Sequence, residues 1–245
     1  MRNKRLLIVA CSAAALFIFA AVALAQQNVY GVNGKVSSGG SKKKPKAVGI
    51  KFGYTVGEAA GNLASPVQTY KISFQGLKAD TKAVKSKCTA ASINAAGDDS
   101  KCPSTAKVGS GQVKSLVGTA GSPPDPNSKC DLALTVYNGG GKHLTLYLAG
   151  DPPNCIAHIA QAIDAPLTAS GGFSTLSFTV PPTLLHPVQG LDVAVTNVSS
   201  TIKKVTKGKR ALFSSVGCKG SREINVVFVD ETGASQTAKT TAGKC

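Results

Sequence analysis

The chain has 245 residues and a mass of about 24.9 kDa, with 42% apolar residues, 16% charged residues, 26 Gly, 12 Pro and no Trp. This composition excludes a collagen, a coiled coil and a polytopic membrane protein, and it supplies enough Val, Ile, Leu and Phe for a folded core. The formal net charge of +16 favours polyanionic partners.

The N-terminal segment has the pattern of an export signal. Arg2, Lys4 and Arg5 precede the uncharged stretch Leu6–Ala25, which ends on Ala23-Leu24-Ala25, the small residues that a signal peptidase requires. We therefore expect a signal peptide at residues 1–25, cleaved after Ala25, and a protein that is secreted or held in the extracytoplasmic cell envelope.

Two alternatives for this segment stay open. About 20 apolar residues can span a bilayer, so the stretch could be retained as an anchor. Cys11 follows Ile8-Val9-Ala10, which loosely fits a lipoprotein box and allows lipidation.

Residues 26–47 show no apolar period. Ser37–Ser41 is a Ser/Gly run, and Lys42-Lys43-Lys44-Pro45-Lys46 is a cationic one. Without apolar side chains to bury, this segment gains no hydrophobic free energy to offset the conformational entropy that it would lose on becoming ordered. It is expected to be a flexible basic linker.

Residues 48–245 read as a β-rich domain. Apolar and polar residues alternate with period two, the pattern of half-buried antiparallel strands, in the runs Ile50–Val56, Tyr70–Phe74, Leu132–Val136, Leu144–Leu148, Leu176–Val180, Leu191–Val195 and Ile224–Phe228. Asn138–Lys142 is a hairpin turn signal, and Thr89–Ala96 is a short helical candidate. Asp230–Gly233 turns the chain into a last strand.

Many short strands with Gly and Pro between them are typical of a sandwich or a barrel. We expect an all-β fold, an antiparallel β-sandwich of about ten to twelve short strands. The alternative is two small sandwiches that split near residue 120, with Gly121–Pro126 as the linker.

Six cysteines lie beyond the signal, and an even number in an exported chain indicates disulfides. Pairing sequence neighbours is the simplest of the possible connectivities, and it gives Cys88–Cys102, Cys130–Cys155 and Cys218–Cys245. A metal site is the rival interpretation, but no Cys-x-x-Cys and no Cys/His cluster with zinc spacing occurs.

Beyond residue 25 the chain keeps 25 of the 28 Lys and Arg and all 12 Asp and Glu, a formal charge of +13. Two cationic clusters are candidate sites for an anionic partner: Lys42, Lys43, Lys44 and Lys46, and Lys203, Lys204, Lys207, Lys209 and Arg210. Export and the lack of an aromatic-rich strand motif argue against nucleic acid. Wall polymers that carry phosphate, or acidic lipid head groups, are the expected partners. The charge could also serve solubility alone.

The search for catalytic chemistry gives no residue to assign. His143, His158 and His186 lie on three separate segments, and neither Gly-x-Ser-x-Gly nor His-Glu-x-x-His occurs. Asp98-Asp99 and Asp230-Glu231 are adjacent pairs, which rarely face each other across a cleft as a glycosidase requires. No catalytic, cofactor-binding or metal-ligating residue is predicted.

Three segments resemble exported, uncharacterised β-rich proteins of actinobacterial type. They are Cys102–Gly111, the hairpin Leu134–Leu148 and the ending Gly217–Cys245. The resemblance implies a secreted, immunoglobulin-like protein, and it carries over no activity and no catalytic residue.

The sequence thus predicts a non-enzymatic, disulfide-stapled β-sandwich, secreted or in the cell envelope, that binds or scaffolds with the help of its basic surface. The alternative is a secreted hydrolase that pairs one histidine with Asp98 or Asp151. A histidine and a carboxylate that converge in a pocket would favour the enzyme.

Overall fold

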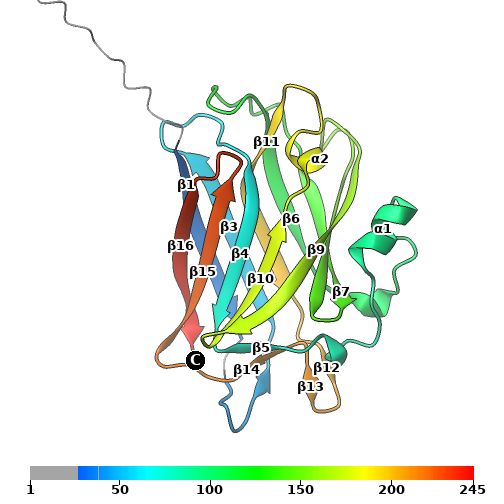
Figure 1. Cartoon of the computed structure of the whole chain (residues 1–245), viewed down its shortest axis with the longest axis vertical. Helices are drawn as coiled ribbons and strands as arrows, with labels where there is room; N and C mark the ends of the chain where they lie inside the picture. Colours follow the sequence, from blue (N-terminus) through cyan, green and yellow to red (C-terminus); the bar gives the residue numbers. More distant parts are fainter. Residues whose placement is uncertain (1–26, 38) are drawn as a thin grey trace, which may run out of the picture.

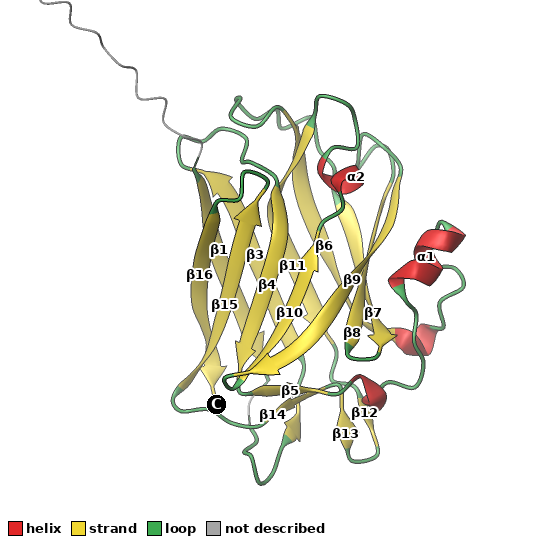
Figure 2. Ribbon diagram, in the orientation of Figure 1, coloured by secondary structure: helices red, strands yellow, loops and turns green. Residues whose placement is uncertain are grey.

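The computed structural model describes residues 27–37 and 39–245, so the expected signal peptide and Cys11 lie outside the described residues. The chain is built almost entirely from antiparallel strands (Figure 2). The strands are β1 (Asn28–Val36), β2 (Lys46–Ala47), β3 (Ile50–Glu58), β4 (Val67–Gln75), β5 (Leu77–Ala79), β6 (Lys107–Gly118), β7 (Leu132–Gly140), β8 (His143–Gly150), β9 (Ile159–Ser170), β10 (Phe173–Thr179), β11 (Asp192–Ile202), β12 (Thr206–Lys207), β13 (Arg210–Ala211), β14 (Phe213–Ser215), β15 (Ser221–Asp230) and β16 (Ser235–Lys244). The helices are α1 (Ala90–Ala96) and α2 (Pro182–Leu185), with 3₁₀ turns η1 (Thr81–Ala83) and η2 (Ser104–Ala106).

Eleven strands form one sheet that is nearly closed into a barrel. Their order is β1-β3-β11-β6-β7-β8-β9-β10-β4-β15-β16. The two end strands, β1 and β16, lie side by side in Figure 1, where the sheet comes back on itself. The antiparallel all-β prediction is confirmed and the predicted sandwich is wrong; an immunoglobulin-like arrangement is not shown.

The strand β9 shows why two separate sheets do not form. It pairs with β8 from Ile159 to Pro166 and then with β10 from Leu167 to Ser170. β9 therefore joins the strands on both sides of it into one sheet, its first part pairing with β8 and its last part with β10. Strands from before and after residue 120 lie together in this one sheet, so the alternative of two small sandwiches that split there does not describe it.

Local irregularities curve the sheet. The β11–β6 register shifts between Val195 and Asn197, and such a bulge increases the local twist. Gly53 and Gly111 allow a close approach to β11, because a Cβ there would lie 2.7 and 2.1 Å from the carbonyl oxygens of Val198 and Ser199. Bulges and glycines of this kind let a sheet curve and close instead of staying open.

The strand β1 corrects the linker prediction. It pairs with β3 along its full length, from Asn28 opposite Glu58 to Val36 opposite Ile50. Its Tyr30 ring stacks on Phe228 of β15, with centroids 4.1 Å apart and planes 9° apart. Residues 28–36 of the predicted linker therefore form an end strand of the barrel, and Lys46–Ala47 form β2.

One end of the barrel is covered by a three-stranded sheet of order β2-β14-β5. Leu77 of β5, Phe213 of β14 and the adjacent Leu212 are buried and belong to the barrel core. Arg222, 1% exposed, holds β14 to the wall by donating to the carbonyl oxygen of Gln75 and to Ser215 Oγ, the latter at 2.8 Å. Burial lowers the pKa of this guanidinium.

The opposite end of the barrel carries α2, as Figure 1 shows. Pro181 and Pro182 end β10 and begin this helix, where the fixed φ of proline suits the first turn. Leu184 and Leu185 are 7% and 3% exposed, and both line the cavity inside the barrel.

The three disulfides join the cysteines that are neighbours in sequence, as predicted: Cys88–Cys102, Cys130–Cys155 and Cys218–Cys245. The first closes the segment that holds α1, whose position confirms the predicted helix. Ile93 of α1, 1% exposed, packs on Tyr137 and Tyr147 outside the barrel. Three disulfides suggest an extracytoplasmic protein.

Candidate functional site

The structure brings the two cationic clusters to one end of the barrel. Segment 39–49 contains β2, and segment 203–217 contains β12, β13 and β14. Ser215 of β14 pairs with Lys46, and Lys204 N lies beside Gly49. Figure 1 shows β5, β14, β12 and β13 together at the end opposite α2.

A third segment, 77–85, completes this surface. It contains β5, which pairs with the other edge of β14, Ser214 opposite Lys78. Asp80 N donates to the carbonyl oxygen of Leu212 (2.8 Å). The segment adds Lys78, Lys82 and Lys85, which are exposed. We call the surface formed by segments 39–49, 77–85 and 203–217 the basic end.

The charge of the molecule is concentrated at the basic end. Its three segments hold 12 of the 25 Lys and Arg beyond residue 25 and one of the 12 Asp and Glu. All nine cations that the sequence singled out are exposed there. The carboxylate is Asp80, which lies 3.9 Å from Arg210 Nε. An exposed pair at that distance is screened by water and salt, so it neutralises little of the local field.

The hairpin β12–β13 presents part of this charge. Thr206 pairs with Ala211 and Lys207 with Arg210 around a turn in which Gly208 has a φ of +57°. Leu212, next in the chain, is fully buried. The buried Leu212 therefore anchors the hairpin to the core, while Lys207 and Arg210 of the hairpin are exposed to water.

The three histidines lie against carboxylates. His143 Nδ1 is 2.8 Å from Asp164, and His158 Nδ1 is 2.5 Å from Asp151. His158 and Asp151 are both more than two-thirds exposed, 72% and 69%, so this pair, which the hydrolase alternative named, stands in solvent rather than in a pocket.

Asp98 has no histidine partner among its contacts. Asp98 Oδ1 accepts a hydrogen bond from the backbone N–H of Ser100 (2.9 Å), and hydrogen bonding by Ser100 lowers the pKa of the Asp98 carboxyl. The hydrolase alternative therefore finds neither of its named carboxylates beside a buried histidine.

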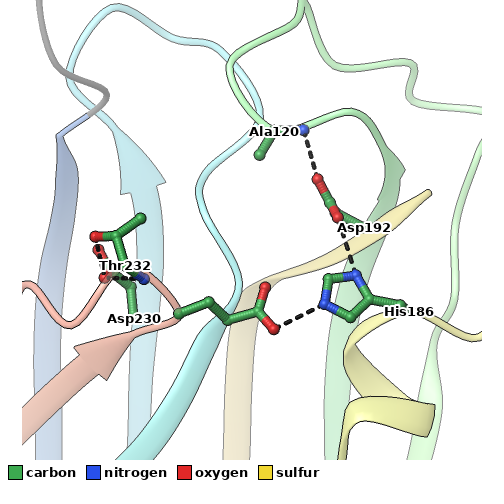
Figure 3. Close-up of polar contacts among 6 residues, drawn as sticks. Ala120, His186, Asp192, Asp230 and Thr232 are labelled. Atoms are coloured by element: carbon green, nitrogen blue, oxygen red, sulfur yellow. Dashed lines mark hydrogen bonds and ion pairs between the residues drawn. The ribbon is translucent and has the colours of Figure 1, made fainter. Parts of the chain in front are cut away.

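His186 is held between two carboxylates at the α2 end of the barrel (Figure 3). Its Nδ1 lies 3.0 Å from Asp192 and its Nε2 lies 2.7 Å from Glu231. Asp192 also accepts from the backbone N–H of Ala120 (2.9 Å). An ionised carboxylate only accepts, so a protonated His186 ring donates at both nitrogens and in that form has no free lone pair for general-base catalysis. The cluster instead ties the α2 loop to β11 and to the β15–β16 turn.

This cluster predicts a pH dependence of stability. The hydrogen bond to Glu231, chiefly, raises the pKa of His186 above its usual value near 6.5, with the charge of Asp192 in support. The stabilisation is then complete below the unfolded-state pKa and is lost as the pH rises through the higher folded-state pKa. Thermal melts of the wild type and of His186→Gln between pH 5 and 9 should differ most at low pH and converge at high pH. A gap that widens with rising pH would contradict the assignment.

Among residues 27–37 and 39–245, no three His, Cys, Asp or Glu side chains lie together in a way that could hold a metal ion. In the same residues no helix is long and apolar enough to cross a membrane. No family model, curated protein or solved structure matches the chain. The function therefore has to be inferred from the geometry of the chain itself.

Sequence reasoning found the two cationic runs but missed Lys78, Lys82 and Lys85. These lysines are separated from one another by two or three residues and show no run. Their place beside the clusters follows from the pairing of β14 with both β2 and β5, which no local pattern reveals.

Proposed function

We propose that this chain is a non-enzymatic binding protein outside the cytoplasm, freed from its signal peptide after Ala25, that contacts anionic envelope material through the basic end. The observation that carries the proposal is the convergence of three segments, distant in sequence, into one surface with 12 cations and one carboxylate. A solubilising charge needs no such gathering, because dispersed lysines serve solubility equally well.

The chemistry that fits the basic end is a surface of repeated phosphate groups. Lysines supply point charges that suit such an array without selecting one geometry, and each is worth about 1 kcal/mol near an anionic membrane. Phosphate-bearing wall polymers and acidic lipid head groups share this chemistry. The cap of β2, β14 and β5 gives the cations a rigid base on the barrel.

The test is co-sedimentation of the oxidised mature protein with vesicles that contain phosphatidylglycerol and, separately, with a purified phosphate-bearing wall polymer. The triple variant Lys203→Gln, Lys204→Gln, Lys207→Gln should bind on the order of 100-fold more weakly than the wild type. Raising the salt concentration should weaken the wild type steeply. The arm that retains the protein identifies the source of the phosphate.

A matched control separates the basic end from net charge. Lys101→Gln, Lys114→Gln, Lys129→Gln removes the same three charges from exposed positions outside the basic end. This control should bind nearly as well as the wild type. Equal losses in the two triple variants, or salt-insensitive binding, would reject the basic end as the contact surface.

A further inference from the structure

The wall of the barrel is open between β9 and β10. The two strands pair over Leu167–Ser170 and Phe173–Leu176, and the ladder then stops. The next pair would be Ser177 with Pro166. Figure 1 shows β9 diverging from β10 beyond this point, toward the α2 end.

Pro166 accounts for the end of the ladder. The N–H groups of a strand point alternately to its two neighbours. Leu167 donates to the carbonyl oxygen of Lys142 beside β8 (2.8 Å), so position 166 faces β10, and proline has no N–H to offer there.

The edge that β9 leaves free is paired in another way. The side-chain amide of Asn94 in α1 donates to the carbonyl oxygen of Ala162 (2.9 Å), and its oxygen accepts from the Ala162 N–H (2.8 Å). An unpaired strand edge normally invites further pairing. Here the Asn94 side chain takes the place of a neighbouring strand at Ala162, which favours separation of β9 and β10 at that point.

A surface depression follows this opening, and a separate cavity lies inside the barrel. The depression is lined by polar groups that include Lys71, Gln161, Asp164, Ser177 and Thr179. The interior cavity has a volume of about 140 Å³ and almost wholly apolar walls. Ile163 of β9 and Phe178 of β10 line both, so these side chains form the boundary between the depression and the cavity.

One polar group faces the cavity without a partner. Ser115 of β6 is 2% exposed and lines the cavity, and its Oγ makes no hydrogen bond. A buried hydroxyl without a partner costs about 1–3 kcal/mol. The other unpaired buried side-chain atoms in the described part of the chain belong to Thr145, Arg222 and Asn225, and none of these residues lines the cavity.

We propose that the barrel binds a small, neutral, mainly apolar molecule that carries one hydrogen-bonding oxygen, enters between β9 and β10, and pairs with Ser115. The volume of this cavity is close to that of an engineered apolar cavity of about 150 Å³ in another protein, which stays dry and binds benzene. We therefore expect a ligand about the size of one substituted benzene ring. A charged ligand is excluded, because no charged side chain lines the interior to compensate its desolvation. This site is separate from the basic end.

The test compares p-cresol with toluene, which has the same ring and methyl group but no hydroxyl. Saturation-transfer NMR and calorimetry on the oxidised mature protein should show saturable binding of p-cresol, with contacts to the methyl groups of Ile163 and Val195. Ser115→Ala should reduce the preference for p-cresol over toluene by about 2- to 10-fold. Ser115→Thr keeps the hydroxyl and should keep the preference, which controls for altered folding.

The route of entry is tested separately. Pro166→Ala returns the missing N–H donor and lets the β9–β10 ladder extend over the opening. Both the association and the dissociation rate of p-cresol should fall several-fold, while its affinity changes little. Unchanged rates, an unchanged preference in Ser115→Ala, or contacts confined to the outer surface would overturn the proposal.

Discussion

Replacing Phe228 by alanine is expected to lower the free energy of unfolding by about 3–5 kcal/mol. Phe228 is fully buried where the end strands of the barrel meet. It stacks on Tyr30 and contacts Tyr54 and Tyr70 edge-on, with centroids 5.4 and 5.7 Å away. Such aromatic pairs add about 0.5–1.5 kcal/mol each beyond the burial of area. Urea denaturation measures the loss.

Two variants sharpen this prediction. Phe228→Leu keeps part of the buried apolar volume but loses the ring contacts, so it should cost less than Phe228→Ala. Phe173→Ala removes a partly exposed ring from β10 and should cost far less than Phe228→Ala. Hydrogen exchange in β1 should accelerate in Phe228→Ala alone, because Tyr30 loses its stacking partner. A cost for Phe228→Ala no greater than that for Phe173→Ala would mean that the barrel is not closed by this contact.

Removing the Cys130–Cys155 disulfide is the second change with a large expected effect. It closes a loop of 25 residues, which corresponds to about 3–4 kcal/mol of unfolded-state entropy. Both residues are 1% exposed in the main core, so Cys130→Ala, Cys155→Ala also loses packed sulfur atoms. Thermal denaturation of the double variant should show a large loss of stability.

The matched variant is Cys88→Ala, Cys102→Ala. Its loop has 14 residues, so the entropic loss is smaller, about 3 kcal/mol, and it lies beside the small outer core around α1 rather than in the barrel. We expect the barrel to survive this change with its wall intact. Detection of free thiols in the unreduced wild-type protein would refute both predictions.

The strands and disulfides could be predicted because their signals are local. Period-two runs such as Ile50–Val56 and Ile224–Phe228 identify strands with one buried face, and β3 and β15 contain them. Cysteines close in sequence meet because short loops return the chain to the same place. The turn at Asn138–Lys142 joins β7 to β8 as its glycines predict.

The barrel could not be predicted, because closure depends on contacts between distant residues. Alternation says which face of a strand is buried but not whether the ends of the sheet meet. The stacking of Tyr30 on Phe228 joins the first and fifteenth strands of the chain. The strand β1 does carry a weak signal, since Tyr30, Val32 and Val36 alternate with polar residues and glycine, but the adjacent Ser/Gly run favoured a linker.

The candidate sites show the same limit. The runs at residues 42–46 and 203–210 were visible as charge, but their convergence depends on β14. Ser115 can be assigned to a binding site only because the structure shows the cavity that it lines. Pro166 can be assigned to an opening only because the structure shows where the β9–β10 ladder ends. A proline inside a strand remains a usable signal for an opening or an edge.

Lysine footprinting tests the central claim, that the basic end is the contact surface, most directly. The mature protein is acetylated with an amine-reactive reagent, free and bound to phosphatidylglycerol vesicles or to wall polymer, and each lysine is quantified by mass spectrometry. We expect protection of Lys42–Lys46 and of Lys203, Lys204, Lys207 and Lys209, with Lys101, Lys114 and Lys129 unchanged. Uniform protection, or protection confined to lysines outside the basic end, would contradict the account.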